Sequence, residues 1–245
     1  MKVLITGGSE GIGRAFAEYY AAHGAHVLLV ARHMEKLMDV KLQLEQKYNT
    51  EVEVFPCDLM QESAVESLYQ QADGDSWDVL INNAGMGYTG FVVDMDSSTV
   101  RHMIQLNVQA LTELCYRYAR GHVHSGGIIV NVSSTGCYQE GPYIAEYYAT
   151  KAYVTSYSRA LAKELLTYGI HVCCLCPGPT DTDFYEKSGG KLPFFSMSPE
   201  KTVQICMKQM NRKTVIVPGV WNRLMLWVPR WIRVKVLMNM KKKQC

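Results

Sequence analysis

Short apolar stretches alternate with longer segments of helical periodicity along most of the chain. The apolar stretches predict strands over residues 2–6, 26–32, 51–59, 78–85, 126–134 and 170–178. The amphipathic segments between them predict helices over residues 13–24, 34–48, 61–72, 97–120 and 147–168. This alternation is typical of parallel strands joined by right-handed crossover helices, and strands covered on both faces read as continuous apolar runs. We therefore predict an α/β fold with a doubly wound parallel sheet, closed by the strand over residues 170–178.

Length and composition narrow the class of protein. The 245 residues are 48% hydrophobic and 20% charged, without an evident linker or repeat, which suits one large soluble domain. We assign residues 1–220 to this domain and residues 221–245 to a basic amphipathic extension. The net charge of +2 and the pI near 8.1 are too mild to indicate a nucleic-acid partner.

The cysteines and the first residues bear on location. The eight cysteines have no histidine at metal spacing, so we predict neither zinc nor disulfides. Cys173, Cys174 and Cys176 lie in an apolar run and read as buried thiols in a reducing compartment. The start, MKVLITGG, runs directly into a glycine motif and does not read as a signal peptide. We therefore expect a cytoplasmic location.

The segment TGGSEGIG follows the first predicted strand and begins the first predicted helix. Its glycines, Gly7, Gly11 and Gly13, permit a tight turn and bring backbone N–H groups close to a pyrophosphate at the helix N-terminus. The spacing is GxxxGxG and not GxGxxG, so the strand–turn–helix context carries the prediction of a dinucleotide site. A glycine-rich turn without a ligand is the alternative.

The end of the second predicted strand bears on the choice of cofactor. An NAD-selective site usually places a carboxylate there to bind the ribose hydroxyls, whereas this chain has Arg32 followed by His33. Ser9 and Arg14 lie in or beside the glycine loop. A cationic group without a competing carboxylate favours a 2′-phosphate, so we predict NADP(H). Alternatively, Arg32 is a solvated residue at the start of a helix.

Tyr147 and Lys151 stand four residues apart in EYYATK and so share one face of a predicted helix. A tyrosine with the ordinary pKa of about 10 is a poor base at pH 7. The Lys151 ammonium and an oxidised nicotinamide ring would favour the phenolate and lower this pKa. Tyr147 could then exchange a proton with a carbonyl or alcohol oxygen. Tyr148 points about 100° away from Tyr147 on a helix and is not expected to share this role.

Further polar residues fall near this pair in the predicted fold. Ser134 ends the strand over residues 126–134, where its hydroxyl could hold the substrate oxygen. Asn107 could anchor a water that links the lysine to solvent. Asp58 follows the third strand and could accept a hydrogen bond from the adenine amino group. Tyrosine and lysine at this spacing are common on helix surfaces, so the pair alone is a weak signal.

Together these segments resemble the short-chain dehydrogenase/reductase family in its single-domain form. The order and spacing of the family's motifs match TGGSEGIG at 6–13, CDL at 57–59, NNAG at 82–85, LNV at 106–108, VSS at 132–134, YYATK at 147–151 and PGPTDT at 177–182. The resemblance covers about residues 1–220. It implies a Rossmann-type fold and an oxidoreductase that interconverts a carbonyl and a secondary alcohol. It maps a catalytic tetrad onto Asn107, Ser134, Tyr147 and Lys151, with Tyr147 as general acid and base.

The resemblance also implies contacts with NADP(H). Thr182 would bond the nicotinamide carboxamide, and Lys151 the nicotinamide ribose hydroxyls. The implied cofactor-binding residues are Gly7, Ser9, Gly11, Ile12, Gly13, Arg32, Asp58, Leu59, Asn83, Ala84, Gly85, Tyr147, Lys151, Pro177, Gly178, Thr180 and Thr182. By resemblance, the helix that carries Tyr147 and the helix before it form the interface of a homodimer or homotetramer.

Three segments are implied to contact the substrate: residues 86–91, 135–146 and 183–197. Their aromatic bias favours a hydrophobic carbonyl compound, such as an acyl chain, steroid or polyketide, over a sugar. The aromatic residues are Tyr88, Phe91, Tyr138, Tyr143, Phe184, Tyr185, Phe194 and Phe195. For any one of them, ordinary packing is the alternative role. Gly189 and Gly190 would let the last segment close as a lid.

Residues 217–245 mix tryptophans and aliphatic residues with arginines and lysines, and Pro229 divides them. A basic amphipathic segment of this kind packs on its own domain or on a partner subunit, lies on an anionic membrane surface, or forms a disordered tail. Its apolar runs are far shorter than the roughly 20 residues that a membrane span requires. Peripheral membrane contact therefore stays open, and a span is not predicted.

Two other classes of function compete with an NADP(H)-dependent oxidoreductase. A regulatory or membrane-associated module could bind NADP(H) without turnover, although the complete tetrad argues against it. An epimerase or dehydratase of the extended type would use the same fold. That type typically has a larger C-terminal substrate domain, and only about 65 residues follow PG here.

Overall fold

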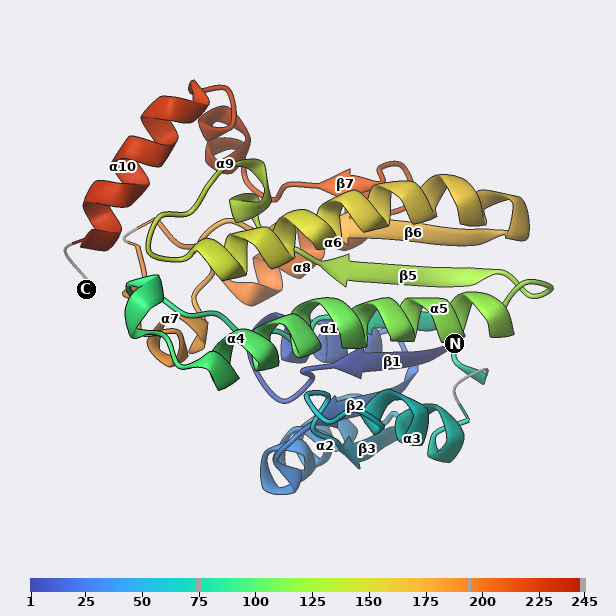
Figure 1. The fold of residues 1–245 in the computed structure, drawn as a ribbon. Helices are drawn as coiled ribbons and strands as arrows, with labels where there is room; N and C mark the ends of the chain where they lie inside the picture. The colour runs from blue at the N-terminus through green and yellow to red at the C-terminus, as the bar shows by residue number, and fades with distance from the viewer. Residues whose placement is uncertain (74–75, 194, 243–245) are drawn as a thin grey trace.

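The computed structural model describes residues 1–73, 76–193 and 195–242. Its strands form one parallel sheet in the order β3-β2-β1-β4-β5-β6-β7 (Figure 1). They are β1 (Lys2–Thr6), β2 (His26–Ala31), β3 (Val52–Pro56), β4 (Val79–Asn82), β5 (Gly127–Val132), β6 (Ile170–Leu175) and β7 (Val215–Ile216). The predicted doubly wound parallel sheet is confirmed.

The prediction that the strands end with residues 170–178 is wrong. β7 pairs with β6 through Cys174 and Val215 and through Leu175 and Ile216, and forms the edge of the sheet. It holds only two residues, too few to stand out from the flanking sequence as an apolar run.

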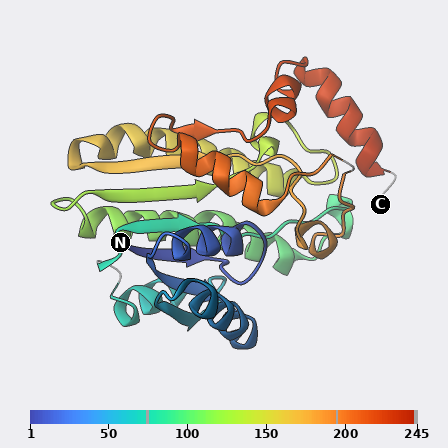
Figure 2. The same cartoon turned by 180° about the vertical axis from the view of Figure 1, so that it is seen from behind.

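Helices cover both faces of the sheet. They include α1 (Gly11–Ala21), α2 (Met34–Tyr48), α3 (Ala64–Gln71), α5 (Leu111–Gly121), α6 (Ala145–Glu164) and α8 (Pro199–Gln209). α1, α2 and α8 lie behind the sheet in Figure 1 and in front of it in Figure 2, and α3, α5 and α6 cover the opposite face. Phe16 of α1 and Leu114 of α5 are at most 1% exposed. Because buried apolar surface contributes roughly 25 cal/mol per Å², these two layers hold the sheet together.

The predicted helix over residues 97–120 is interrupted. α4 (Ser97–Ile104) passes into a π-helical segment, η3 (Gln105–Ala110), before α5 begins. A π turn accommodates an extra residue, and such segments are frequent at functional sites. Asn107 lies in η3 and is 1% exposed. The sequence did not indicate this turn, because the helices on either side of it have ordinary helical periodicity.

The order of strands reverses beside β1, because the chain returns from β3 at one edge to β4. In open α/β sheets, ligands bind at such a reversal, in the crevice outside the carboxyl ends of the strands. In Figure 1 these ends point left, toward α7 (Phe184–Lys187) and α10 (Arg230–Lys242). The candidate site therefore lies at this end of the sheet.

Two helices follow β7 at the C-terminal end of the chain. α9 (Val220–Met225) and α10 are joined around Pro229 and project beyond the sheet (Figure 1). Across the described residues, no helix combines the length and the apolar content that crossing a membrane requires.

Candidate active site

The glycine loop forms a cradle between β1 and α1. Gly7 and Gly11 have φ angles of 65° and 55°, in the left-handed region that favours glycine. A Cβ at Gly13 would lie 2.1 Å from the carbonyl oxygen of Gly7, so only glycine fits this turn. Among the described residues, no side chain caps the N-terminus of α1, and its first turn contains no acidic residue. The free N–H groups of this turn fit a pyrophosphate, which a helix N-terminus attracts.

A hydrogen-bond network joins this cradle to the end of β4. The Thr6 Oγ1 atom accepts from the backbone N–H groups of Asn83 (3.0 Å) and Ala84 (3.1 Å). The Asn83 amide donates to the carbonyl oxygens of Thr6 (3.0 Å) and Gly7 (3.1 Å). Sequence reasoning did not single out Thr6. Its position directly before the first glycine is the signal that could have indicated it.

The outer edge of the cradle is a shallow hollow of about 410 Å³, lined by Ser9, Glu10, Arg14, Glu35, Lys36, Asp39, Val40 and Asp183. Arg14 donates a hydrogen bond to Gln43 (2.6 Å). Arg32 is exposed to solvent and directly follows the last residue of β2. Ser9 and Arg14 thus meet in this hollow, while Arg32 does not line it.

Two predicted contacts beyond β3 have local roles in the structure. The Asp58 carboxylate accepts from the Met60 backbone N–H (3.1 Å), and Leu59 is 4% exposed. Asp58 therefore shapes its own turn. Its contact with adenine stays a prediction.

The segment after β6 closes the other side of the cradle. A Cβ at Gly11 would lie 3.0 Å from the Thr182 Cγ2 atom, so Thr182 lies against the glycine loop. Thr180 donates to the carbonyl oxygen of Gly178 (3.0 Å). The carbonyl oxygen of Pro177 accepts from the N–H of Thr135 (2.8 Å), which ties this segment to the residue after Ser134. Ile12 lies in the first turn of α1.

Tyr147 and Lys151 lie on the first turns of α6, as the sequence predicts. The Lys151 Nζ atom is 5.7 Å from the centre of the Tyr147 ring and donates to the carbonyl oxygen of Val132 (2.8 Å). Lys151 is 4% exposed. The Lys151 side chain, which α6 carries, is therefore bound to the last residue of β5.

Asn107 and Gly85 complete this group. Asn107 donates to the carbonyl oxygen of Met86 (2.8 Å) and to Thr150 (3.1 Å), and its Oδ1 atom accepts from the N–H of Met86 (2.9 Å). A Cβ at Gly85 would lie 3.2 Å from Asn107 Oδ1 and 3.4 Å from Lys151 Nζ. Gly85 thus leaves the space in which these two polar groups approach each other.

Ser134 follows β5 and caps a short 3-10 helix, η4 (Thr135–Tyr138), by accepting from the N–H of Gly136 (3.1 Å). Burial raises the pKa of Tyr147, and a hydrogen bond between the Tyr147 and Ser134 hydroxyls offsets part of this rise. The neighbouring Ser133 donates to the carbonyl oxygen of Lys151 (2.8 Å). The four residues of the predicted tetrad therefore meet at the carboxyl ends of β4 and β5.

The electrostatics differ from what the residue spacing suggested. Burial of the phenol raises the pKa of Tyr147 well above its ordinary value, and this effect exceeds that of Ser134. Burial lowers the pKa of Lys151 to about 8. Burial therefore outweighs the lowering of the Tyr147 pKa that was expected from Lys151, whose own charge is disfavoured by burial. The protein alone therefore keeps the phenol protonated at neutral pH.

A family model described as short chain dehydrogenase matches residues 1–192. The chain belongs to this family. The match contains every residue of the tetrad and the segment after β6, and ends before α8, β7, α9 and α10.

Three known proteins are similar to this chain over most of its length. The very-long-chain 3-oxoacyl-CoA reductase of Rattus norvegicus is 28% identical over 249 residues, which cover 98% of this chain and 79% of the relative. The short-chain dehydrogenase of Sphingobium yanoikuyae in complex with NADPH has a TM-score of 0.86 at 30% identity, covering 96% of this chain and 94% of that one. The bulky-bulky ketone specific alcohol dehydrogenase of Comamonas testosteroni has a TM-score of 0.81 at 29% identity, covering 96% and 93%. The chain is thus an oxidoreductase of the short-chain dehydrogenase type.

Aromatic side chains border the candidate catalytic group of this short-chain dehydrogenase. The rings of Tyr147 and Phe184 of α7 have centres 5.1 Å apart. A Cβ at Gly87 would lie 2.7 Å from Phe184 Cζ, so α7 packs directly over the candidate site. Phe91 and Tyr143 form an edge-to-face pair at 4.9 Å. The predicted aromatic contact Phe194 lies outside the described residues.

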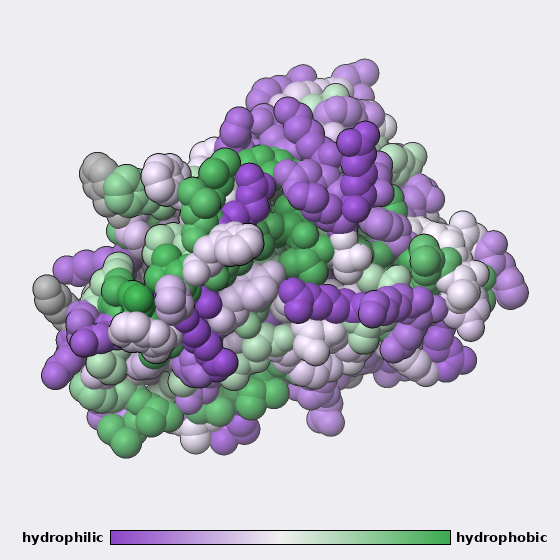
Figure 3. All heavy atoms as spheres, turned by 90° about the horizontal axis from the view of Figure 1, so that it is seen from above, coloured by the Kyte–Doolittle hydropathy of each residue, from purple (hydrophilic) through white to green (hydrophobic). Residues whose placement is uncertain are grey.

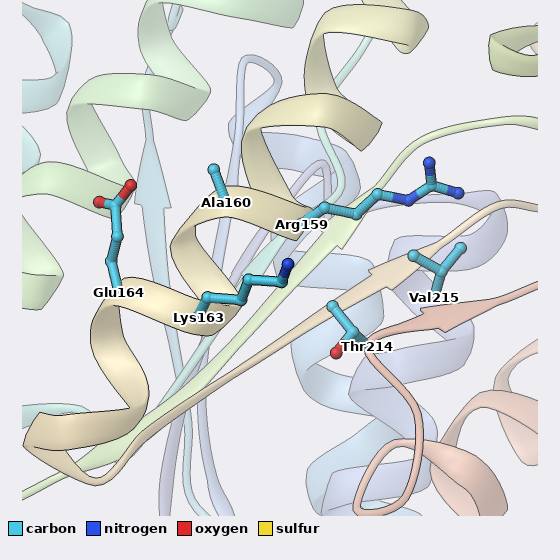
Figure 4. Close-up of a pocket in the computed structure, with 6 residues that line it drawn as sticks. All are labelled: Arg159, Ala160, Lys163, Glu164, Thr214 and Val215. Carbon is cyan, nitrogen blue, oxygen red and sulfur yellow. The ribbon is translucent and has the colours of Figure 1, made fainter.

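A second hollow of about 650 Å³ lies between α6 and β7, lined by Arg159, Ala160, Lys163, Glu164, Thr214 and Val215 (Figure 4). It is near the C-terminal end of α6, whereas Tyr147 and Lys151 are on the first turns of the helix. This hollow is therefore separate from the candidate catalytic group.

Proposed function

We propose that this short-chain dehydrogenase is an NADP(H)-dependent reductase of a hydrophobic carbonyl compound, with Tyr147 as the proton donor. The observation that carries the proposal is the meeting of Asn107, Ser134, Tyr147 and Lys151 beside the glycine cradle. The cofactor would supply the hydride. The chain's own residues would hold the carbonyl and provide the proton.

The raised pKa of Tyr147 favours carbonyl reduction at neutral pH. A protonated phenol is ready to donate to the oxygen that becomes an alkoxide, whereas oxidation of an alcohol requires the phenolate. The Ser134 hydroxyl would hold the same oxygen. Lys151, held by Val132, would bind the nicotinamide ribose hydroxyls and keep a positive charge near the phenol. Asn107 would position Met86 directly and, through its hydrogen bond to Thr150, the turn of α6 that carries Lys151.

The free N-terminus of α1 and the exposed Arg32 support NADP(H) as cofactor. Of the remaining predicted contacts, Ser9, Asn83, Ala84 and Thr182 lie against the same cradle. One relative of similar structure is described in complex with NADPH. A 2′-phosphate near Arg32 would account for the missing carboxylate after β2.

A hydrophobic substrate, such as an acyl chain or a steroid, is supported by the aromatic residues around Tyr147. The relatives named above act on very-long-chain 3-oxoacyl-CoA and on bulky ketones. Comparing the turnover of a short apolar ketone with that of a long acyl substrate would show whether the size of the pocket or its polarity selects the substrate.

We further propose a cytoplasmic location and a homodimer or homotetramer. The described cysteines are free, and Cys115, Cys173, Cys174, Cys176 and Cys206 are buried, which suits a reducing compartment. Tyr116 on α5 is 53% exposed and Tyr153 on α6 is 40% exposed, which supports a subunit contact across these helices. Light scattering during gel filtration measures the mass of the assembly and so tests the proposed oligomer.

The decisive experiment combines titration with NADPH and NADH and a panel of ketones followed by NADPH absorbance. We expect tighter binding of NADPH. Arg32→Glu should shift the preference toward NADH by about tenfold to a hundredfold, since a hydrogen bond to a charged group contributes roughly 1.5–3 kcal/mol. Arg212→Glu, at an exposed position away from the cradle, is the control. Failure to bind either cofactor would refute the proposal, and binding without turnover would favour a regulatory module.

A further inference from the structure

The C-terminal part of the chain differs from the rest in charge. Residues 201–245 contain 11 of the 25 lysines and arginines and none of the 23 aspartates and glutamates. The first 200 residues are therefore net acidic. The protein joins an acidic body to a strongly basic end, although its total charge is close to zero.

Three of the four tryptophans lie in this basic end and are exposed to solvent. Trp221 is 78%, Trp227 86% and Trp231 70% exposed. The fourth, Trp77, is 2% exposed, and its indole N–H donates to the carbonyl oxygen of Ala72 (2.7 Å). This chain therefore buries a tryptophan that serves packing. The other three tryptophans lie on α9, on α10 and between these two helices. Their exposed rings are available for contact with a partner outside the subunit.

Exposed aliphatic side chains lie among the tryptophans. Leu224 and Met225 are each 51% exposed, Val236 is 49% and Met240 is 47%. Figure 3 views this end from above, and on its left, the side where Figure 1 places α10, green apolar spheres alternate with purple ones. The surface is thus apolar and basic together.

Some of the basic residues fix α10 to the body. Arg230 forms an ion pair with Glu140, and Arg233 donates to Gln139 (3.0 Å). At the other end of the helix, Lys241 donates to Thr89 (3.4 Å) and is 7% exposed. These contacts place α10 across the segments that precede and follow the candidate site.

Other basic residues of this end point away from the body. Arg223, Lys235 and Lys242 are exposed, and no carboxylate within residues 1–73, 76–193 and 195–242 pairs with them. Basic side chains beside exposed tryptophans are the pattern of a helix at a membrane interface. Tryptophan favours the headgroup level there, and lysine and arginine attract anionic lipids.

We propose that α9 and α10 dock on the surface of an anionic lipid bilayer. Trp221, Trp227 and Trp231 would enter the headgroup layer, and Arg223 and Lys235 would meet the anionic headgroups. A second copy of the chain fits this surface less well. In a two-fold symmetric contact the same basic patch would face itself, and like charges would repel.

Docking would also place the candidate active site near the bilayer. α10 touches Gln139 and Thr89, which belong to the segments after Ser134 and after Gly85. A carbonyl on an apolar chain could then pass from the lipid to Tyr147. This consequence rests on the proposed function, whereas the docking itself does not.

Flotation of the full chain with vesicles tests the docking. The vesicles contain phosphatidylcholine alone or an equal mixture with phosphatidylglycerol. We expect binding to the anionic vesicles and weaker binding to the neutral ones. Each basic residue near such a surface contributes roughly fivefold, so joint substitution of Arg223, Lys235 and Lys242 by Gln should lower the partition coefficient about a hundredfold.

Matched variants show whether the effect belongs to this surface. Trp227→Ser with Trp231→Ser should reduce binding to both kinds of vesicle. Joint substitution of Lys163, Arg212 and Lys213 by Gln, and Leu166→Ser at a position 68% exposed, should bind as the unchanged protein does. Equal losses in these controls would overturn the proposal.

Two further outcomes would also overturn it. The first is a lack of binding to anionic vesicles. The second is a lipid-free oligomer in which acrylamide fails to quench the tryptophans, since a partner subunit would then cover them. NADPH-dependent turnover of a water-soluble ketone, measured without vesicles, reports the proposed function independently. A failure of docking and a failure of catalysis are therefore distinguishable.

Discussion

The candidate active site and the C-terminal helices hold their polar residues in opposite ways. Asn107 and Lys151 are buried, and each donates a hydrogen bond to a second buried residue, Thr150 and Val132 respectively. Arg230 forms its ion pair with Glu140 on an exposed surface. An unpaired buried group costs roughly 1–3 kcal/mol, whereas an exposed ion pair typically contributes little. Single substitutions in the candidate active site should therefore lower activity or stability strongly. Single substitutions that remove an attachment of α10 should change stability only slightly.

Tyr147→Phe should have the largest effect. Removing the proton donor should lower NADPH-dependent carbonyl reduction about a hundredfold to ten-thousandfold, because general acid catalysis contributes that much. The protein should stay folded, since the ring and its contact with Phe184 remain. Tyr148→Phe is the matched control and should retain activity within a few fold. Equal losses in both variants would contradict the assignment of Tyr147.

Lys151→Met should remove a pH dependence of stability. The pKa of Lys151 is about 8 in the folded protein against an ordinary 10.5. Between these values the unfolded chain binds a proton that the folded chain lacks, so this residue makes stability rise with pH in that window. The free energy of unfolding of the unchanged protein relative to the variant should therefore grow by roughly 3 kcal/mol from pH 8 to 10.5. Urea denaturation at several pH values measures this difference in the free energy of unfolding. The same pH dependence in both proteins would contradict a buried lysine.

Asn107→Ala should cost about 1–3 kcal/mol of folding stability, because the N–H and C=O groups of Met86 lose their partner. Asn222→Ala in α9 is the comparison. Asn222 donates one hydrogen bond, to the carbonyl oxygen of Pro218 (2.7 Å), and its loss should cost about 1 kcal/mol or less. Urea denaturation of both variants shows which substitution lowers the free energy of unfolding more. A larger loss for Asn222→Ala would contradict the contrast between the two regions.

Arg230→Gln should have the smallest effect. The midpoint of thermal unfolding should stay unchanged, because the ion pair with Glu140 is exposed. Hydrogen exchange should become faster in α10 alone, since this helix loses one of its attachments. A large fall in the midpoint would show that α10 is an integral part of the core.

The sequence alone predicted the regular part of the fold and the cofactor cradle. The apolar runs revealed six strands, and the glycine motif after the first strand singled out Gly13, whose close contact with Gly7 in the structure admits no side chain. β7 and the π turn at Asn107 were missed. β7 depends on pairing with β6 rather than on a pattern of its own, and a π turn leaves helical periodicity almost unchanged.

Electrostatics in the site were the least predictable part. The spacing of Tyr147 and Lys151 indicates that they are neighbours, but the degree of burial decides the direction of each pKa shift. Burial follows from how β5, α6 and α7 pack together, and no local pattern encodes it. The exposure of Trp227 and Trp231 likewise required the structure, because their sequence suits packing and membrane contact equally.

The order of strands also has a consequence for biosynthesis. β2 and β3 are added outward from β1 on one side, and β4, β5, β6 and β7 are added outward from β1 on the other. Each strand that leaves the ribosome therefore finds its partner already made, with a single return across the sheet between β3 and β4. Because domains generally fold from the N-terminus during synthesis, the cofactor cradle can form before the C-terminal helices exist. α9 and α10, which border the candidate active site, are then put in place only after the sheet has formed.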